Sequence, residues 1–196
     1  PLLSDRKRLS RSKRCMGEYF FAKTLDKVAP NGIVSFVTTK GTLDKQNPKV
    51  REYLAKRADL VGAVRLPNNA FKANAGTEVT ADIIFLQKRE KMAVELPDWC
   101  YVGKNHDGIP VNNYFLDHPE MILGTMKQGM EFSMYGNADE TACVPIEEAD
   151  LSEQLEKAVS NLKLTNAIRK RTQETEKEAG VIPAVEDVRN FAFAEV

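Results

Sequence analysis

The sequence predicts an α/β fold with a mixed sheet, and three segments carry that prediction. Residues 33–38 are apolar and largely β-branched, a pattern typical of a strand buried on both faces, as in a parallel sheet. A helical pattern over 48–58 and a second apolar strand over 60–66 complete a right-handed βαβ unit. The strand predicted over 79–87 follows a loop without a helix, so we expect it to run antiparallel and to end the sheet.

The helices of this unit are predicted from the spacing of apolar residues and from helix-end signals. Residues 16–29 place four apolar side chains on one helical stripe, namely Phe20, Phe21, Leu25 and Val28. Asn47 is expected to cap the crossover helix, and Pro48 to take its first position. The loop 67–78 is polar and rich in small residues, and we expect no helix there.

Beyond residue 88 the signals are weaker. We expect a short strand over 99–102 and a turn over 105–108, whereas 113–124 and 130–135 fit short helices or strands equally well. Asp150, with Glu at the third position after it, predicts the start of a long helix. Its apolar face would hold Leu151, Leu155, Ala158, Leu162 and Leu164.

The predicted C-terminal helix becomes polar on all sides over 169–178, with Gly180 as its C-cap. These signals divide the chain into four parts. We expect a basic, disordered start, one half of an α/β domain, an extension, and a helical connector toward a further module, over 1–15, 16–90, 91–147 and 148–196 respectively.

The composition favours a soluble cytoplasmic protein. Of the 196 residues, 42% are hydrophobic and 29% charged, and the formal net charge is zero, which gives no general attraction to nucleic acid or membrane. The acidic side chains cluster over 139–156, so DNA contacts should avoid that stretch. No segment approaches the roughly 18 apolar residues that a membrane span needs.

The cysteines and histidines do not form a recognisable site. Cys15, Cys100 and Cys143 lie far apart without a C-x-x-C pair, which indicates reduced thiols and argues against zinc. His106 and His118 are expected on the solvated surface. We therefore expect neither a metal site nor a Ser-His-Asp or Cys-His catalytic arrangement.

Motifs for cofactor binding are also absent from the 196 residues. The chain has no G-x-G turn, no G-K-[ST] and no Pro-Pro pair. Without a glycine-rich loop it offers no close backbone approach to a dinucleotide or a phosphate. We accordingly expect no cofactor-binding or catalytic residue within the chain, which also counts against a nucleotide-binding enzyme of unrelated chemistry.

The segment from Tyr19 to Lys88 nevertheless resembles the second half of adenine-N6 DNA methyltransferases of the type I modification-subunit kind. The resemblance rests on the order of several elements: Tyr19-Phe20-Phe21-Ala22-Lys23, the strand entered through Asn31-Gly32, Val50-Arg51-Glu52-Tyr53-Leu54, the Leu66-Pro67-x-x-x-Phe71 element, and a Gly-Thr before an apolar strand. The remainder, 89–196, resembles phage and mobile-element proteins that join such a methylase to a Swi/Snf-type helicase.

The resemblance implies a partial Rossmann-like class I methyltransferase sheet with a helical extension. The parent enzyme would transfer a methyl group from S-adenosylmethionine to an adenine flipped out of DNA, and would carry its donor loop and catalytic Pro-Pro motif elsewhere. Phe71 matches a Phe that stacks on the flipped base; its alternative role is to pack onto the sheet. Asn68 and Asn69 would contact the base or serve as turn residues. Lys72 would contact a DNA phosphate.

The same resemblance implies the surroundings of the strand 33–38. In the complete sheet it would lie between the strand that leads into the catalytic motif and the strand 60–66. This chain lacks the first of these neighbours, so we expect the bare edge to be covered by 1–15 or paired with a second copy, the homodimer being preferred. The alternative function is a protein or DNA interaction module of a restriction-modification or helicase assembly, with the helix 151–179 as its surface.

Overall fold

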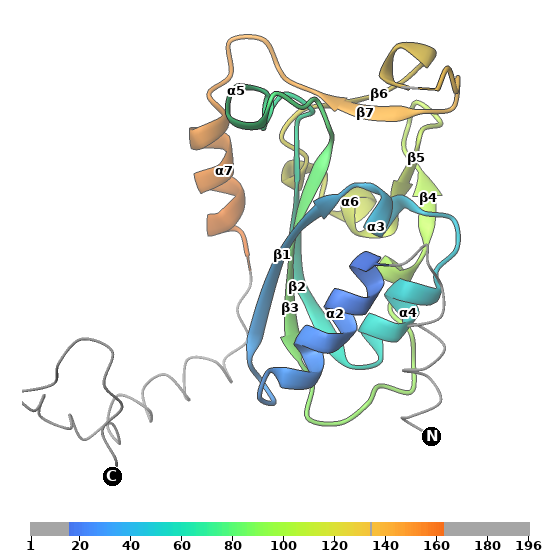
Figure 1. The fold of residues 1–196 in the computed structure, drawn as a ribbon, viewed down its shortest axis with the longest axis vertical. Coiled ribbons are helices and arrows are strands. Elements are labelled where there is room, and N and C mark those ends of the chain that lie inside the picture. The colour runs from blue at the N-terminus through green and yellow to red at the C-terminus, as the bar shows by residue number, and fades with distance from the viewer. Residues whose placement is uncertain (1–15, 134, 163–196) are drawn as a thin grey trace, which may run out of the picture. The chain divides into compact units, whose positions relative to one another are not determined.

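The structure, a computed structural model, describes residues 16–133 and 135–162. Its central sheet has three strands in the order β1-β3-β2 (Figure 1). They are β1 (Ile33–Thr39), β2 (Ala58–Leu66) and β3 (Ala81–Lys88). Because β3 is antiparallel to both neighbours, β1 and β2 run in the same direction. The predicted α/β class and the reversal of the last strand are confirmed.

The predicted strand order is wrong, because β3 lies between β1 and β2. Its pairing extends from Ala81 to Gln87 on the β1 side and from Ala81 to Lys88 on the β2 side. Ile84 is 1% exposed and Leu86 0%, so the central position removes these apolar side chains of β3 from water. The crossover from β1 to β2 therefore spans two strand positions.

Strand β1 is not buried on both faces, as its composition suggested. Val34 is buried and Phe36 half-buried on one face, but Val37 on the other face is 61% exposed and Ile33 is 40% exposed. The β-branched run reflects the pleated geometry of the strand rather than two-sided burial. Within the described residues, the edge of β1 that faces away from β3 pairs with no strand.

Two helices cover the buried face of the sheet (Figure 1). They are α2 (Met16–Lys27) and α4 (Lys49–Ala55), and both confirm the predicted helices. The ring centroids of Phe21 on α2 and Phe36 on β1 lie 4.3 Å apart. The predicted start of α4 is off by one residue, because Pro48 takes the N-cap position and Lys49 the first helical position, while Asn47 Oδ1 still accepts a hydrogen bond from the backbone N–H of Lys49 at 3.2 Å.

The loops that follow β1 and β2 each contain a single helical turn. After β1 comes α3 (Gly41–Asp44), and after β2 comes α5 (Lys72–Ala75). The expectation of a helix-free loop over 67–78 is wrong in this detail. The turn ends at Gly76, whose φ of 63° lies in the left-handed region that favours glycine.

The second half of the chain consists of short elements and two small antiparallel sheets, β4-β5 and β6-β7. In order these elements are η1 (Asp98–Cys100), β4 (Val102–Lys104), β5 (Pro110–Asn112), α6 (Asn113–Asp117), η2 (Pro119–Met121), β6 (Thr125–Gln128), η3 (Met130–Phe132) and β7 (Thr141–Val144). Of the predicted strand over 99–102, Trp99 and Cys100 are buried in the 3-10 turn η1, and only Val102 belongs to a strand, β4. The turn over 105–108 is confirmed by a backbone bond from Gly108 N–H to Asn105 O at 3.0 Å.

The last described helix is α7 (Leu151–Ser160), and it begins as predicted. Asp150 Oδ1 accepts a hydrogen bond from the backbone N–H of Ser152 at 2.9 Å. The helix ends at Ser160, so the prediction that it continues through Leu162 is wrong. The helix packs against β2, and Leu162, beyond its end, has its side chain beside Gly62. The predictions for 1–15, the polar helix 169–178 and Gly180 lie outside the described residues.

One hydrophobic core joins elements from both sides of residue 90. Leu25, Leu54 and Leu86 share it with Phe115 and Met121. Buried polar groups tie the same parts together: Arg51 Nε donates to Cys100 O at 2.7 Å, and Asn112 Nδ2 donates to Leu43 O and Trp99 O, both at 2.9 Å. None of the described helices is both long and apolar enough to cross a membrane.

Candidate functional site

The carboxyl ends of β1 and β2 define the candidate site. Thr39 and Leu66, the last residues of these strands, both pair with Ala81 at the start of β3, so the strands end at the same level. The loops 40–48 and 67–80 meet where Lys40 N–H donates to Thr80 O at 3.1 Å, and they then diverge, with α3 on the right of the sheet and α5 at the top left in Figure 1. In open α/β sheets, ligands bind outside the carboxyl ends of parallel strands.

The loop 67–80 contains all four residues that the sequence singled out. Asn68 and Phe71 are half-buried, and Phe71 packs against the core, whereas Asn69 and Lys72 are exposed. Lys72 Nζ lies 2.5 Å from Glu78 Oε1, so its charge is paired within the loop. Within the described residues, the side-chain amides of Asn68 and Asn69 make no hydrogen bond.

The β6-β7 hairpin lies across this loop (Figure 1). The backbone C=O of Cys143 accepts from Asn68 N–H at 2.7 Å, and the backbone N–H of Cys143 donates to Thr80 Oγ1 at 2.9 Å. Lys40, just after β1, donates from Nζ to Glu140 Oε1 at 2.7 Å and to Thr141 Oγ1 at 2.9 Å. The candidate site therefore consists of two loops and a hairpin.

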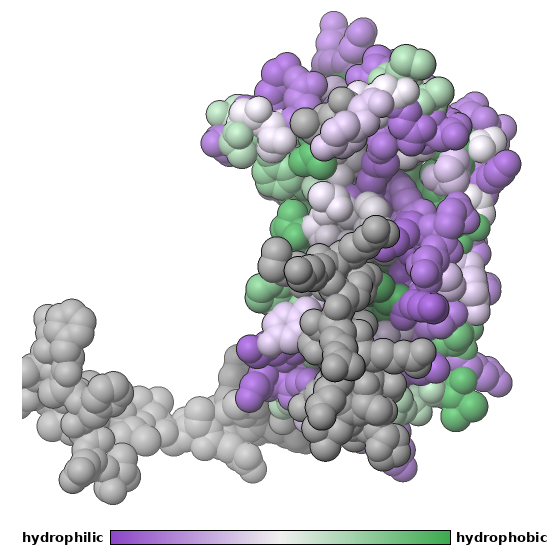
Figure 2. All heavy atoms as spheres, turned by 45° about the vertical axis from the view of Figure 1, so that its right-hand side comes forward, coloured by the Kyte–Doolittle hydropathy of each residue, from purple (hydrophilic) through white to green (hydrophobic). Residues whose placement is uncertain are grey.

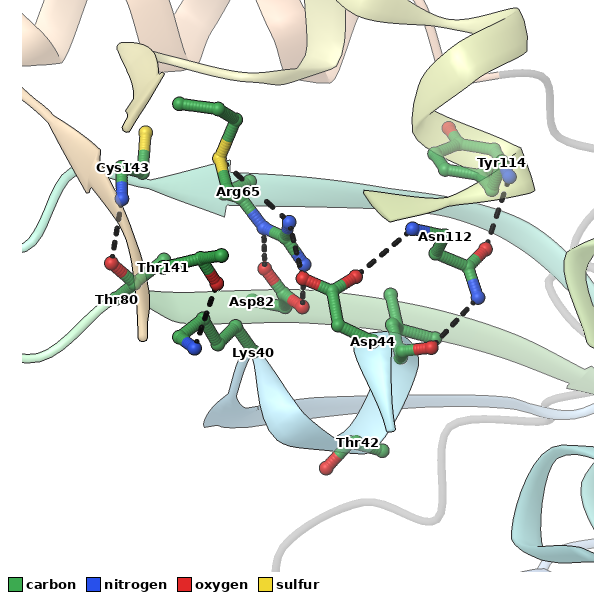
Figure 3. A network of polar contacts seen from close by, with 12 residues as sticks. Lys40, Thr42, Asp44, Arg65, Thr80, Asp82, Asn112, Tyr114, Thr141 and Cys143 are labelled. Atoms are coloured by element: carbon green, nitrogen blue, oxygen red, sulfur yellow. Dashed lines mark hydrogen bonds and ion pairs between the residues drawn. The ribbon is translucent and has the colours of Figure 1, made fainter. Parts of the chain in front are cut away.

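A buried ion network lies at the end of β2 and the start of β3 (Figure 3). Arg65 Nε and Nη2 donate to the two carboxylate oxygens of Asp82 at 2.8 and 2.9 Å, and Arg65 Nη1 lies 2.8 Å from Asp44 Oδ2. Asp44 Oδ1 also accepts from Asn112 N–H at 3.0 Å. The guanidinium carbon of Arg65 sits 4.4 Å from the ring centroid of Phe115. The network links β2, β3, α3 and α6.

Electrostatics keep Arg65 charged in this environment. Its burial alone would lower the pKa of Arg65, but the carboxylates of Asp82 and Asp44 outweigh that effect and raise this pKa above its ordinary value. Neither Arg65 nor Asp82 has any exposed side-chain surface. We assign the network a structural role, namely to fix the strand ends from which the loops start.

Sequence reasoning overlooked this network, although a signal for it exists. Arg65 and Asp82 each interrupt an apolar strand, and residues of these types are almost never fully buried unless paired. Two opposite charges inside neighbouring predicted strands would have indicated a cross-strand pair. Asp44 and the hairpin contacts gave no comparable signal, because they lie in loops and short elements.

Among the described residues, the two cysteines are buried, whereas the side chains of the two histidines reach the solvent. Burial raises the pKa of the Cys143 thiol to about 12 and that of Cys100 to about 11, so both are poor nucleophiles at neutral pH. The side chains of His106 and His118 are 87% and 45% exposed, which confirms their predicted surface position. In the described part of the chain, no cluster of His, Cys, Asp and Glu could hold a metal ion.

A pocket of about 530 Å³ lies between the β4-β5 turn and residues 119–126, and no residue of the loop 67–80 lines it. Figure 2, in which the side carrying α4 and β4 comes forward, shows a largely hydrophilic surface with small, separate hydrophobic patches.

Comparison with known proteins places this fold in a family. The family model described as N-6 DNA methylase matches residues 10–121, more than half of the chain. The chain belongs to the N-6 DNA methylase family. The matched segment contains the whole central sheet and the loop 67–80, but it ends before β6 and β7.

A curated relative is the "Defense against restriction protein B" of Escherichia phage P1. It is 34% identical over 84 residues, which make up 42% of this chain and 4% of the phage protein. The chain therefore corresponds to a small part of that relative's length. No solved structure matches the chain.

Proposed function

We propose that this chain forms the part of an S-adenosylmethionine-dependent DNA adenine-N6 methyltransferase that holds the target adenine. Its sheet would be the second half of the Rossmann-like methyltransferase sheet. The observation that carries the proposal is the position of the loop 67–80, which lies inside the family match and at the carboxyl end of β1 and β2.

The chemistry of the loop fits a base turned out of the duplex. An adenine must leave the base stack before its exocyclic nitrogen can be methylated, and exposed bases are held by aromatic faces and polar edges. Phe71 is half-buried against the core. Its ring can therefore pack on the core while its exposed surface stacks on a base. The amides of Asn68 and Asn69 each offer donors and an acceptor for the edge of a base.

The methyl donor does not fit the residues of this chain. The 196 residues contain neither a G-x-G turn nor a Pro-Pro motif. The loop after β1 contains the helical turn α3 instead of a glycine-rich turn. We place the donor site and the catalytic motif in another part of the same polypeptide or in a partner chain. This chain alone is then inactive as a methyltransferase. Only the complete methylase, which includes those parts, transfers the methyl group.

A second candidate function is favoured by the open edge of β1. This strand has one unpaired edge within the described residues, and Val37 is 61% exposed beside it. Such an edge is a template for a further strand. In this reading the chain is an interaction module of a restriction-modification or helicase assembly, and a second copy or a further segment of that assembly pairs with β1.

The two candidates are distinguished by Phe71→Ala in the complete methylase. Base stacking is worth about 1 to 3 kcal/mol, so we expect methyl transfer to fall roughly tenfold or more while duplex affinity changes little. Phe85→Ala, at a half-buried position in the middle of β3, serves as the matched control for lost packing. If both variants lose the same activity, or Phe71→Ala loses none, Phe71 is a packing residue and the base-holding role is wrong.

A further inference from the structure

The β6-β7 hairpin lies beyond the segment that matches the methylase family, yet it forms hydrogen bonds with that segment at the candidate site. The family match ends at residue 121, and the hairpin begins at Thr125. Its attachment points are the end of β1, the start of the loop 67–80 and the start of β3. An element outside the common fold thus makes contact with the proposed base-holding loop.

Cys143 joins the two ends of that loop through its backbone. Its C=O accepts from Asn68 N–H at 2.7 Å, and its N–H donates to Thr80 Oγ1 at 2.9 Å. Cys143 is 0% exposed and Thr80 3%, so water cannot replace either bond easily. The C=O of Asn68 in turn accepts from Val79 N–H at 2.9 Å, which closes the loop on itself.

Short-range bonds carry this constraint from Asn68 to Phe71. Ala70 N–H donates to Pro67 O and Lys72 N–H donates to Asn69 O, both at 3.0 Å. These two turns leave the loop few ways to move without breaking a hydrogen bond. The position of the Phe71 ring therefore depends on where Asn68 is held.

Lys40 adds a second, weaker attachment. Its backbone N–H donates to Thr80 O at 3.1 Å, and its Nζ reaches Glu140 on the hairpin. The same Nζ also donates to Thr141 (Figure 3). The Lys40 and Glu140 side chains are 21% and 35% exposed, so solvent weakens this pair. The buried bond between Thr80 and Cys143 is the stronger constraint.

We propose that the β6-β7 hairpin positions the base-holding loop, with Thr80 as the positioning residue. Thr80 holds Cys143, Cys143 holds Asn68, and Asn68 sets the place of Phe71 against the flipped adenine. Thr80 touches no substrate in this arrangement. The inference rests on the proposed function of the loop, but the mechanical link between hairpin and loop does not.

The link is tested first in this chain by hydrogen exchange. Thr80→Val removes the hydroxyl but keeps the β-branched shape, and the loss of one buried bond should speed exchange of the Asn68 and Val79 amides about tenfold. Thr80→Ser should restore slow exchange. Thr125→Val is the matched control, because Thr125 is exposed on the same hairpin. Unchanged exchange rates of the amides that pair β1 with β3 would show that the variant keeps its fold.

If Thr80→Val unfolds the sheet, Lys40→Met is the second variant, because it releases the hairpin without touching the Thr80 hydroxyl. It should speed exchange of the same two amides by a smaller factor. Unchanged exchange at Asn68 in the folded variant would overturn the link.

The functional part is tested in the complete methylase. We expect Thr80→Val to lower kcat about tenfold or more with little change in KM for DNA, since a small misplacement of a positioning group affects the transition state. Thr80→Ser should restore kcat, and Thr125→Val should leave it unchanged. Faster loop exchange with unchanged kcat overturns the positioning role. A wild-type enzyme without methyl transfer overturns the proposed function, while the exchange data still decide the link.

Discussion

Arg65 on β2 and Asp82 on β3 lie directly opposite each other in the sheet and form an ion pair with no exposed side-chain surface. The pair sits one residue before the end of β2 and one residue after the start of β3. The loop 67–80 starts directly after β2 and ends directly before β3. The ion pair therefore fixes the two strand ends between which the loop is held.

We expect Asp82→Asn to destabilise the fold by about 3 to 5 kcal/mol, because it leaves the buried charge of Arg65 without its main partner. Urea unfolding of the wild-type and variant chains measures the difference. Because Asp44 also pairs with Arg65, the triple variant Arg65→Met, Asp82→Leu and Asp44→Asn should recover much of the loss, since it leaves no buried charge of the network without a partner.

The matched control is the surface pair between Arg89 and Asp59, whose side chains are 34% and 49% exposed. Asp59→Asn should cost less than about 1 kcal/mol, since solvent screens such pairs. Equal losses in Asp82→Asn and Asp59→Asn would show that the buried pair does not hold the strand ends.

The buried thiols should make the fold sensitive to alkaline pH. Burial raises the pKa of Cys143 to about 12 and that of Cys100 to about 11, from an ordinary value of 9.0. The folded state therefore keeps protons that the unfolded state releases, so this contribution to stability is complete below the unfolded pKa and is lost as the pH rises through the folded values. Urea midpoints measured at neutral pH and at about pH 10 should show the loss.

Thiol labelling checks the same point independently. In a Cys15→Ser background, Cys100 and Cys143 should react with an alkylating reagent far more slowly in the folded chain than in urea. Rapid labelling of either thiol in the folded chain at neutral pH would contradict its burial and its raised pKa.

The sequence predicts the strands and helices of the central sheet well, but it does not predict which strands lie next to each other. Apolar runs and helix-end signals located β1, β2, β3, α2 and α4 because these depend on local pattern. Strand order depends on contacts across the whole sheet, which place β3 between β1 and β2. A local pattern contains no information about those contacts.

The candidate site divides in the same way. The loop 67–80 was found because its residues match a family pattern over a short stretch. Cys143, which holds this loop, is 63 residues away from Thr80 along the chain, and it contacts the loop through its backbone N–H and C=O. Backbone contacts can be made by any residue type, so composition could not reveal them.

Lys72 provides a test of the DNA contact. Its ion pair with Glu78 is exposed, with side chains 65% and 52% accessible, so a phosphate can replace the carboxylate at little cost. We expect Glu78→Gln to strengthen DNA binding and Lys72→Met to weaken it. In the Lys72 variant, the slope of log affinity against log salt should become less negative by about 0.9. An unchanged slope would show that Lys72 contacts no phosphate.

The absence of a glycine-rich turn predicts that this chain alone does not bind S-adenosylmethionine. Only glycine lets a backbone approach such a ligand closely, and no G-x-G occurs in the sequence. Titration calorimetry of the chain should therefore show no heat of binding, whereas the complete methylase should bind the donor. Micromolar binding by the chain alone would place the donor site within these residues.

The open edge of β1 predicts self-association through strand pairing. Its unpaired backbone groups are next to Val37, which is 61% exposed, and no charged residue interrupts the strand from Ile33 to Thr39. Because a charge on an edge strand discourages pairing, Val37→Lys should convert a dimer of the chain into a monomer in sedimentation experiments without changing its unfolding midpoint. Val94→Lys is the matched control, since Val94 is 95% exposed in a loop away from the sheet edge. The same experiment on residues 16–196 separates pairing with a second copy from coverage by the basic segment 1–15. A shortened chain that sediments as a clean monomer at every concentration would refute both explanations, because neither cover would then be needed.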